Sequence, residues 1–241
     1  MLNALESNFS NANLSNTSDL RAQLDSIHRS SHDAVAIQVL APLSTSYLPW
    51  STSALRPSGL VKILNEIVIN RRNNILECGG GISTLYIARL LKQQGHGHLY
   101  TLEDNLGWIE VLQNLLKNQG LDDYVTLIPA PLVPCNLALD DNQWYDLTAA
   151  NAILKKPTID FLIVDGPPAY DEKRRRSRYP ALPELKSVLA SDFAILLDDI
   201  NRSGEAEIIE KWSAEFGLEF EQYFYDGDIA IARSQGGYHV G

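Results

Sequence analysis

Three consecutive glycines, Gly79, Gly80 and Gly81, stand between a short apolar run and a stretch with helical spacing. Because glycine lacks a β-carbon, a ligand can lie directly against such a turn, and the first amides of the following helix face it as donors. Glu77 precedes the glycines and adds a carboxylate, which can accept hydrogen bonds from an ammonium group and repels a pyrophosphate. The pattern predicts a ligand-binding turn, in which a branched side chain at Gly79 would block the ligand without disturbing the fold.

A second acidic position follows the next predicted strand. Glu103 ends the run of residues 98–103 and Asp104 follows it, roughly 20 residues beyond the glycines. Nucleoside-binding α/β folds place at this point the acid that holds the ribose hydroxyls. A carboxylate can accept from both hydroxyls, so Glu103 is the candidate for a nucleoside contact.

Two further predicted strands also end in carboxylates. Asp165 ends residues 161–165, and Asp198 ends residues 194–198 and is followed by Asp199. Since the carboxyl ends of parallel strands meet at one edge of a sheet, these side chains are expected beside the ligand-binding crevice. They could act as a general base or as ligands of a divalent cation, and both roles use the same oxygens. A structural alternative for Asp198 and Asp199 is helix capping or a salt bridge with Arg202.

The elements that must position these residues follow a repeated alternation of apolar runs and helical stretches, which is typical of β–α–β units. Predicted strands cover residues 75–77, 98–103, 125–129, 161–165 and 194–198, and predicted helices cover residues 84–94, 107–119, 183–189 and 205–216. Residues 218–225 and 229–233 flank Asp226 and Gly227, a dipeptide that favours a tight hairpin turn. The predicted fold is an α/β, Rossmann-like, doubly wound and mostly parallel seven-stranded sheet that ends in an antiparallel hairpin.

The N-terminal residues differ in composition from this region. Residues 1–18 are rich in Asn and Ser, so they offer little apolar surface to offset the chain entropy lost on folding. Thr17 or Ser18 can cap a short amphipathic helix, and another helix is expected over residues 58–70. We expect a partly flexible, helical extension over residues 1–45 and one domain over residues 46–241.

The amino-acid composition restricts the classes of partner that the protein is expected to bind. The chain of 241 residues has 20 Lys and Arg against 30 Asp and Glu, a net charge of −10, and so lacks the cationic surplus of a nucleic-acid binder. Its two cysteines, Cys78 and Cys135, argue against a disulfide scaffold or a structural zinc site. The sequence shows neither a signal peptide nor an apolar run of membrane-spanning length. We expect a cytoplasmic protein without nucleic-acid or membrane partners, and leave a homodimer open.

The motif Glu77-x-Gly79-x-Gly81, together with Glu103, Asp165 and the closing hairpin, resembles class I S-adenosylmethionine-dependent methyltransferases over residues 47–233. Residues 163–168, 178–182 and 197–199 further resemble a bacterial subgroup distantly similar to catechol O-methyltransferases. The resemblance implies S-adenosylmethionine as cofactor, with Glu77 and the glycines at its methionine end, Glu103 at the ribose and the turn at Ala130 at the adenine edge. The full implied set of cofactor-binding residues is Glu77, Gly79, Gly80, Gly81, Ser83, Thr84, Glu103, Asp104, Ala130 and Asp165.

The same resemblance bears on the reaction centre. Catechol-type enzymes hold magnesium with an aspartate after the fourth strand and an Asp-Asn pair after the fifth. Asp165 and Asp198 match, while Asp199 stands where the asparagine would fall. The resemblance therefore implies catalytic roles for Asp165 and Asp199, and an optional Mg²⁺ held by these two and Asp198. The expected substrate contacts are Trp50, Arg178, Tyr179 and Arg202.

The function expected is methyl transfer to an oxygen, less readily a nitrogen, of a small acceptor. The basic run of residues 173–178 would suit an anionic acceptor, although a solvated charge run is an equal reading. An NAD-dependent dehydrogenase is an alternative that uses the same turn, but Thr84 replaces the third glycine of that fingerprint. A non-catalytic nucleoside-binding module is the other alternative. Calorimetry with both cofactors would test the first, and methyl release from the cofactor would exclude the second.

Overall fold

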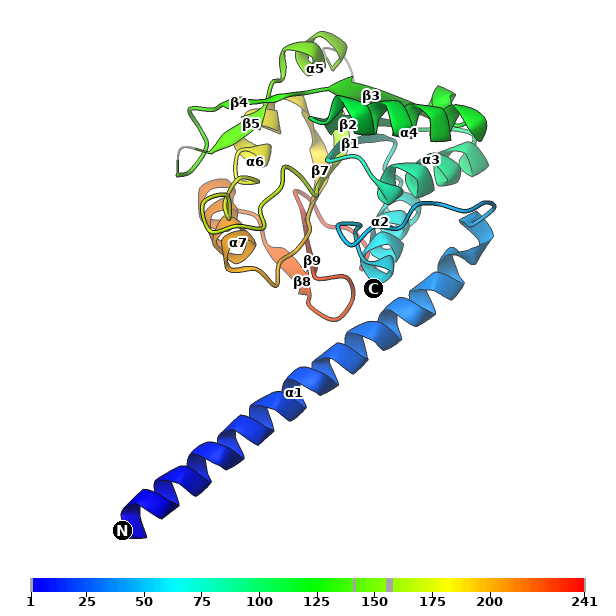
Figure 1. Ribbon diagram of the computed structural model, residues 1–241. Helices are drawn as coiled ribbons and strands as arrows, with labels where there is room; N and C mark the ends of the chain where they lie inside the picture. Colours follow the sequence, from blue (N-terminus) through cyan, green and yellow to red (C-terminus); the bar gives the residue numbers. More distant parts are fainter. Residues whose placement is uncertain (1, 141, 155–157, 241) are drawn as a thin grey trace.

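A seven-stranded sheet forms the centre of the fold, in the strand order β3-β2-β1-β6-β7-β9-β8 (Figure 1). The computed structural model describes residues 2–140, 142–154 and 158–240, with side chains from residue 19 onward. The parallel strands are β1 (Asn74–Cys78), β2 (His98–Glu103), β3 (Val125–Pro129), β6 (Ile159–Val164) and β7 (Leu189–Leu197). The antiparallel edge consists of β8 (Phe220–Tyr223) and β9 (Ile229–Arg233). The doubly wound, Rossmann-like fold predicted from the sequence is confirmed.

Helices cover both faces of this sheet (Figure 1). One face packs against α2 (Pro57–Ile69), α3 (Ile82–Gln94) and α4 (Leu106–Asn118), and the other against α5 (Thr148–Ile153), α6 (Ala181–Leu185) and α7 (Ser203–Phe216). Successive strand residues alternate between the two cores: Ile163 and Leu196 point to the first, Leu162 and Leu197 to the second. Because both faces are buried, these strands are continuous apolar runs, which is why the sequence revealed them.

Smaller elements complete the chain. A separate two-stranded antiparallel sheet, β4 (Leu132–Pro134) and β5 (Gln143–Tyr145), lies outside the main sheet. Short 3₁₀ turns are η1 (Ala41–Leu43), η2 (Asp122–Tyr124) and η3 (Lys186–Val188). The helix predicted over residues 183–189 is shorter than expected, because η3 ends it and β7 begins at Leu189. The polar start of β7 hid the first half of that strand from a search for apolar runs.

The N-terminal helix α1 (Leu2–Leu40) is one continuous helix (Figure 1). Its second half is fastened to the domain by ion pairs from Arg29 to Asp228, at 3.0 Å, and from Arg56 to Asp33, also at 3.0 Å. The helix therefore begins well before the predicted cap at residues 17 and 18. The partial flexibility of residues 1–45 and a domain start at residue 46 stay predictions. Within the described part of the chain, no helix combines the length and the apolarity needed to span a membrane.

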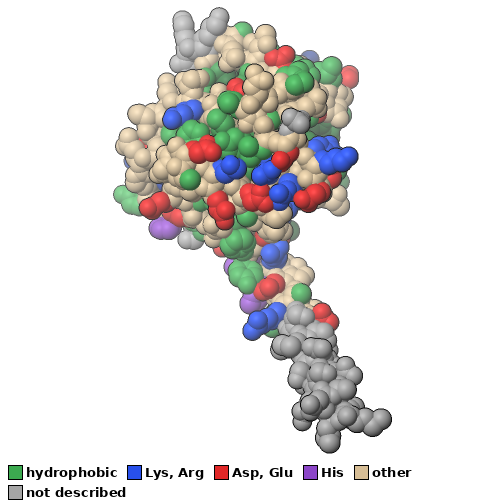
Figure 2. Space-filling view, turned by 90° about the vertical axis from the view of Figure 1, so that its left-hand side faces the viewer, with side chains coloured by type: hydrophobic (Ala, Val, Ile, Leu, Met, Phe, Trp, Pro, Cys, Tyr) green, Lys and Arg blue, Asp and Glu red, His purple; other side chains and the backbone are tan. Residues whose placement is uncertain are grey.

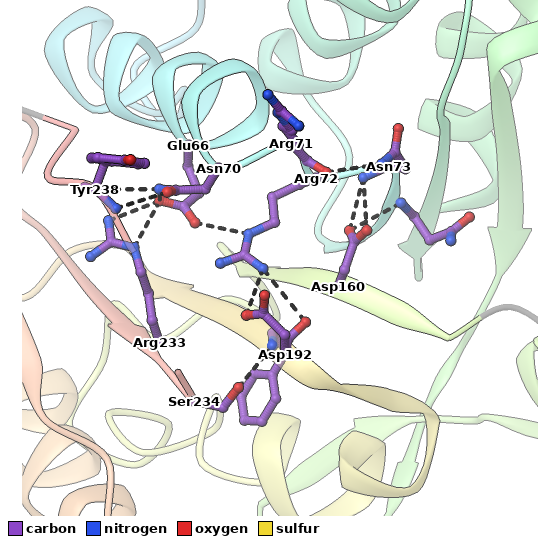
Figure 3. A network of polar contacts seen from close by, with 12 residues as sticks. Glu66, Asn70, Arg71, Arg72, Asn73, Asp160, Asp192, Arg233, Ser234 and Tyr238 are labelled. Atoms are coloured by element: carbon purple, nitrogen blue, oxygen red, sulfur yellow. Dashed lines mark hydrogen bonds and ion pairs between the residues drawn. The ribbon is translucent and has the colours of Figure 1, made fainter. Parts of the chain in front are cut away.

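A buried ionic network stabilises the edge of the sheet where the strands begin (Figure 3). Glu66 of α2 is fully buried, and its carboxylate accepts hydrogen bonds from Arg72 at 2.9 Å and from Arg233 at 2.8 and 3.0 Å. Arg72 also donates to Asp192 of β7 at 3.1 Å, and Asp160 of β6 accepts from the backbone that enters β1. These contacts join α2, β6, β7 and β9 at the edge opposite the strand ends that bear Glu103 and Asp165.

Removal of the Glu66 carboxylate should lower the stability of the fold. Glu66→Ala leaves two buried guanidinium groups without their shared counter-ion, so we expect the free energy of unfolding to fall by about 3–5 kcal/mol. Urea denaturation of this variant measures the loss, with the exposed Glu110→Ala on α4 as a control that should change it by less than about 0.5 kcal/mol. Equal stability of the two variants would show that the network contributes nothing.

Candidate functional site

The two strand-end turns that carry the predicted site residues lie in direct contact. The strand order reverses between β1 and β6, and at such a switch point α/β folds bind their ligands. Gly79 has φ of +90°, and a β-carbon built on it would lie 2.8 Å from the carbonyl oxygen of Asp165. Glycine is therefore required at this position by backbone packing and by its positive φ. A side chain there would disturb the fold, so the expectation that it would block only a ligand is wrong.

A cavity of about 820 Å³ lies over these strand ends. Most of the predicted site residues line it: Gly79, Gly80, Gly81, Ser83, Glu103, Asp104, Asp165, Arg178, Asp198, Asp199 and Arg202. Five others lie outside its lining: Trp50, Glu77, Thr84, Ala130 and Tyr179. The structure thus brings the glycine turn, the acid after β2 and the three strand-end aspartates to one cavity.

Glu77 lies behind the glycine turn, fully buried. Its carboxylate accepts hydrogen bonds from the hydroxyls of Ser83 at 2.5 Å, Thr84 at 2.6 Å and Thr101 at 3.0 Å. Burial raises the pKa of Glu77 to about 7, although the three hydroxyls oppose this shift. Thr84 also accepts from the backbone amide of Gly81 at 3.0 Å. In this arrangement Glu77 holds the turn in shape and lies outside the cavity lining.

Glu103 lines the cavity and is held from two sides. Its carboxylate oxygens accept from the backbone amides of Gly80 and Asn105, each at 2.9 Å. Burial raises the pKa of Glu103, while these backbone hydrogen bonds oppose the rise. Each carboxylate oxygen has a second lone pair, so the group can still accept hydrogen bonds from a ligand. The indole of Trp108 donates to the Gly80 carbonyl at 2.8 Å and lines the same wall.

The three strand-end aspartates form a cluster around Arg178. One oxygen from each of Asp165, Asp198 and Asp199 lies within 4.8 Å of the others. Arg178 Nη2 lies 3.3 Å from Asp165 Oδ1 and 3.0 Å from Asp199 Oδ2. Asp199, which lines the cavity, has φ of +64°, an uncommon backbone conformation for a residue other than glycine. Arg178, the expected substrate contact, is therefore the counter-ion of Asp165 and Asp199, the expected catalytic residues.

The protonation of this cluster follows from its burial. Burial raises the pKa of Asp165 to about 7, with Arg178 opposing the shift and Asp199 adding to it. Burial also raises the pKa of Asp198 well above its usual value, and the charges of Asp165 and Asp199 raise it further. Asp165 and Asp198 therefore keep a proton to higher pH than separate carboxyls would.

The donor set alone would suit Mg²⁺, because hard cations prefer carboxylate oxygens. The position between Asp165 and Asp199, however, is taken by Arg178 Nη2. Arg178 is buried and also donates to the carbonyls of Pro167 at 3.3 Å and Asp198 at 3.2 Å, so it is anchored along its whole guanidinium. A divalent ion at the same oxygens would lie against a fixed positive charge. The residues present do not fit the magnesium site expected from the sequence.

Two further predicted substrate contacts, Tyr179 and Trp50, lie outside the cavity lining, and the arginines at the surface of the basic run are neutralised by ion pairs. The Tyr179 hydroxyl donates to Glu215 of α7 at 2.5 Å, and Trp50 packs edge-on against Tyr86. The basic run forms surface ion pairs, namely Arg174 with Asp171, Arg175 with Glu207, and Arg176 with Asp140 and Glu207. Figure 2 shows acidic and basic side chains interspersed over the face that carries α7. The run is thus mainly a solvated charge cluster.

Sequence reasoning missed part of the cavity wall. Arg56 and Asp228 both line it and form an ion pair at 2.9 Å. They stand 172 positions apart, so no local pattern connects them. Trp108 carried a usable signal, because it lies in the first turn of the helix after the ribose-type acid, on the side of the glycine turn.

A family model described as a methyltransferase domain matches residues 76–200, from β1 to just beyond the aspartate pair. The chain belongs to this methyltransferase family. The matched region holds the glycine turn, Glu103, Arg178 and all three clustered aspartates. The resemblance to class I S-adenosylmethionine-dependent methyltransferases is therefore confirmed for family and fold.

Solved structures agree with this fold. A Staphylococcus aureus protein assigned as a caffeoyl-CoA O-methyltransferase matches with a TM-score of 0.55 at 16% identity, over 82% of this chain and 91% of that one. The human methyltransferase 10 domain containing protein matches with a TM-score of 0.51 at 11% identity, over 85% and 94%. A Geobacter sulfurreducens methyltransferase matches with a TM-score of 0.50 at 13% identity, over 84% and 87%. Among curated proteins, no sequence matches this methyltransferase.

The contact between the two turns predicts unequal effects at neighbouring glycines. Gly79→Ala must place its β-carbon against the Asp165 carbonyl at positive φ, so we expect a loss of about 1–3 kcal/mol in unfolding free energy. Gly81→Ala is the matched control, because a β-carbon there approaches only Ser83 Oγ at 4.0 Å. Thermal and urea unfolding of both variants measure the difference. Two variants of equal stability would contradict the close approach of the turns.

Proposed function

We propose that this methyltransferase transfers the methyl group of S-adenosylmethionine to an oxygen of a small acceptor bound in the same cavity. One observation supports this most strongly. A single cavity is lined both by the glycine turn with Glu103 and by the strand-end aspartates. A reaction between a nucleoside-type cofactor and an acceptor needs both sets of groups within reach of each other.

The cofactor half rests on Gly81 and Glu103. The backbone of Gly81 faces open space, because a β-carbon built there meets nothing closer than Ser83 Oγ at 4.0 Å. The methionine end of the cofactor can therefore lie against it. Glu103, already fixed by two backbone amides, accepts from the ribose hydroxyls through its remaining lone pairs. We assign Glu77 and Thr84 to shaping the turn, since both are buried behind it.

The acceptor half rests on the aspartates. A base with a pKa near the working pH is the most effective proton acceptor, and burial raises the pKa of Asp165 to about 7. Asp165 removes the hydroxyl proton as the acceptor oxygen attacks the methyl carbon in line with the carbon–sulfur bond. The new carbon–oxygen bond forms, the old bond breaks, and its electron pair stays on sulfur. Asp199, paired with Arg178 and with Arg202 at 2.9 Å, positions the acceptor at the cavity mouth.

The acceptor class follows from the charges left free in the cavity. The surface run of arginines is engaged in ion pairs, so an anionic acceptor would depend on Arg202 and Arg56. Arg56 is itself paired with Asp33 and Asp228. We therefore favour a neutral hydroxyl compound over an anion. A nitrogen acceptor is the second candidate, because the same base could deprotonate an ammonium group.

Membership of a methyltransferase family argues against a dehydrogenase and against a non-catalytic nucleoside-binding module. Glu77 and Thr84 also depart from the dinucleotide fingerprint, as the buried hydroxyl network around Glu77 shows. We further propose a cytoplasmic location, no nucleic-acid or membrane partner, and a homodimer as the oligomeric state to test.

Methyl release from labelled S-adenosylmethionine, in the presence of a fractionated small-molecule extract, tests the function. We expect one or a few fractions to accept label, and mass spectrometry then identifies the acceptor and the methylated atom. A protein that binds the cofactor but transfers no methyl group to any fraction would contradict the proposal.

A side chain at Gly81 should block the cofactor without damaging the fold. We expect Gly81→Val to weaken S-adenosylmethionine binding by at least about tenfold, because the added atoms fill space next to the glycine turn. Gly236→Val is the control, since a β-carbon there meets nothing within 4 Å and Gly236 lies outside the cavity lining. If calorimetry gave both variants wild-type affinity, the methionine end would have to lie elsewhere.

The rate of methyl transfer should rise with pH through about 7, because Asp165 acts as a base only after it loses its proton. Asp165→Asn should lower kcat by about 10²–10⁴-fold and remove this rise, while the affinity for S-adenosylmethionine changes little. The exposed Asp122→Asn serves as control. A pH-independent rate in the wild type, or full activity of Asp165→Asn, would exclude Asp165 as the base.

A further inference from the structure

Arg178 differs from the other arginines of the basic run, because its side chain is only 5% exposed. Its guanidinium donates to the carbonyl oxygens of Pro167 and Asp198. It also pairs with the carboxylates of Asp165 and Asp199. Burial alone would lower the pKa of Arg178, but the surrounding carboxylates raise it above its usual value. The group is therefore a permanent cation that the fold holds in one orientation.

A fourth carboxylate lies on the other side of this cation. Glu205, in the first turn of α7, is fully buried, and neither of its carboxylate oxygens has a hydrogen-bond partner among the described residues. Its nearest positive charges are Arg178 Nη1 and Arg202 Nη1, each at 3.8 Å. Such a buried carboxylate is stable only near a fixed positive charge. Arg178 thus balances negative groups on its cavity side and on its α7 side.

We propose that the guanidinium of Arg178 replaces a divalent cation in this cluster, so that the wild-type protein binds no metal ion there. Removal of the guanidinium converts Asp165, Asp198 and Asp199 into a divalent-cation site. The spacing supports this second statement, because three carboxylate oxygens within 4.8 Å of one another can ligate one ion. The inference concerns the same cavity as the proposed function, and it rests on that proposed function for the role of the aspartates.

The replacement has a consequence for the acceptor. A metal ion offers open coordination positions that two neighbouring oxygens of one molecule can fill together. Arg178 offers no such position, because a guanidinium has only N–H donors, and four of its five face Pro167, Asp198, Asp165 and Asp199. The acceptor is then held by hydrogen bonds, and one hydroxyl group suffices. The acceptor class includes monohydroxy compounds, which a metal-chelating site would bind poorly.

Titration with Mn²⁺, followed by electron paramagnetic resonance of the free ion, tests the inference directly. We expect the wild type to leave Mn²⁺ free, and Arg178→Met, which keeps the side-chain volume, to bind one ion at least about tenfold more tightly. Arg178→Met combined with Asp199→Asn should lose that ion. Arg202→Met is the matched control, because Arg202 also pairs with Asp199 but lies at the rim, and it should behave as the wild type.

Two results would overturn the inference. One is a wild type that binds Mn²⁺ and loses it on Asp199→Asn, and the other is a folded Arg178→Met that binds none. If Arg178→Met did not fold, the same titration of the wild type and of Arg178→Lys, which retains a cation, would decide whether the inference holds. Free Mn²⁺ with both proteins would support the inference. Mn²⁺ bound to the wild type would end it. The titration contains neither cofactor nor acceptor, so failure of the proposed methyl transfer would leave its result unchanged.

Discussion

The contact between the backbone of Gly79 and the carbonyl of Asp165 determines where everything else in the cavity can lie. The two turns follow β1 and β6, the neighbours between which the strand order reverses. Because Gly79 lacks a β-carbon, the turns approach more closely than any other residue would allow. The glycine turn and the strand-end aspartates therefore share one wall, and their relative position is set by backbone packing rather than by flexible side chains.

The cavity edge concentrates negative charge that the fold must balance. Asp165, Asp198, Asp199 and Glu205 surround Arg178, and leaving a buried charge of this kind without its partner costs about 3–5 kcal/mol. At the opposite edge of the sheet, the buried Arg72 and Arg233 share Glu66 (Figure 3), and each has a second carboxylate partner, Asp192 and Glu221 respectively. The fold thus separates an edge that is satisfied and structural from an edge where incompletely satisfied carboxylates are available for chemistry.

Much of the fold and of the cavity could be predicted from the sequence, because strands buried on both faces are continuous apolar runs. The acids at their ends then fall at one edge, as found for Glu103, Asp165 and Asp199. The direction of a side chain could not be predicted. Within the basic run only Arg178 turns inward, and Glu77 points behind the turn toward three hydroxyls. These orientations depend on contacts between distant segments, which a local pattern does not contain.

The central claim is that the glycine turn and Glu103 form the binding site for S-adenosylmethionine. Isothermal titration calorimetry of the wild type and Glu103→Ala, with S-adenosylmethionine and separately with NAD⁺, tests it most directly. We predict one-to-one binding of S-adenosylmethionine by the wild type, no binding of NAD⁺, and an affinity about ten- to a hundredfold lower for a folded Glu103→Ala, because charge-assisted hydrogen bonds to the ribose are lost. Tight binding of NAD⁺ without S-adenosylmethionine, or an unchanged affinity in Glu103→Ala, would contradict the account.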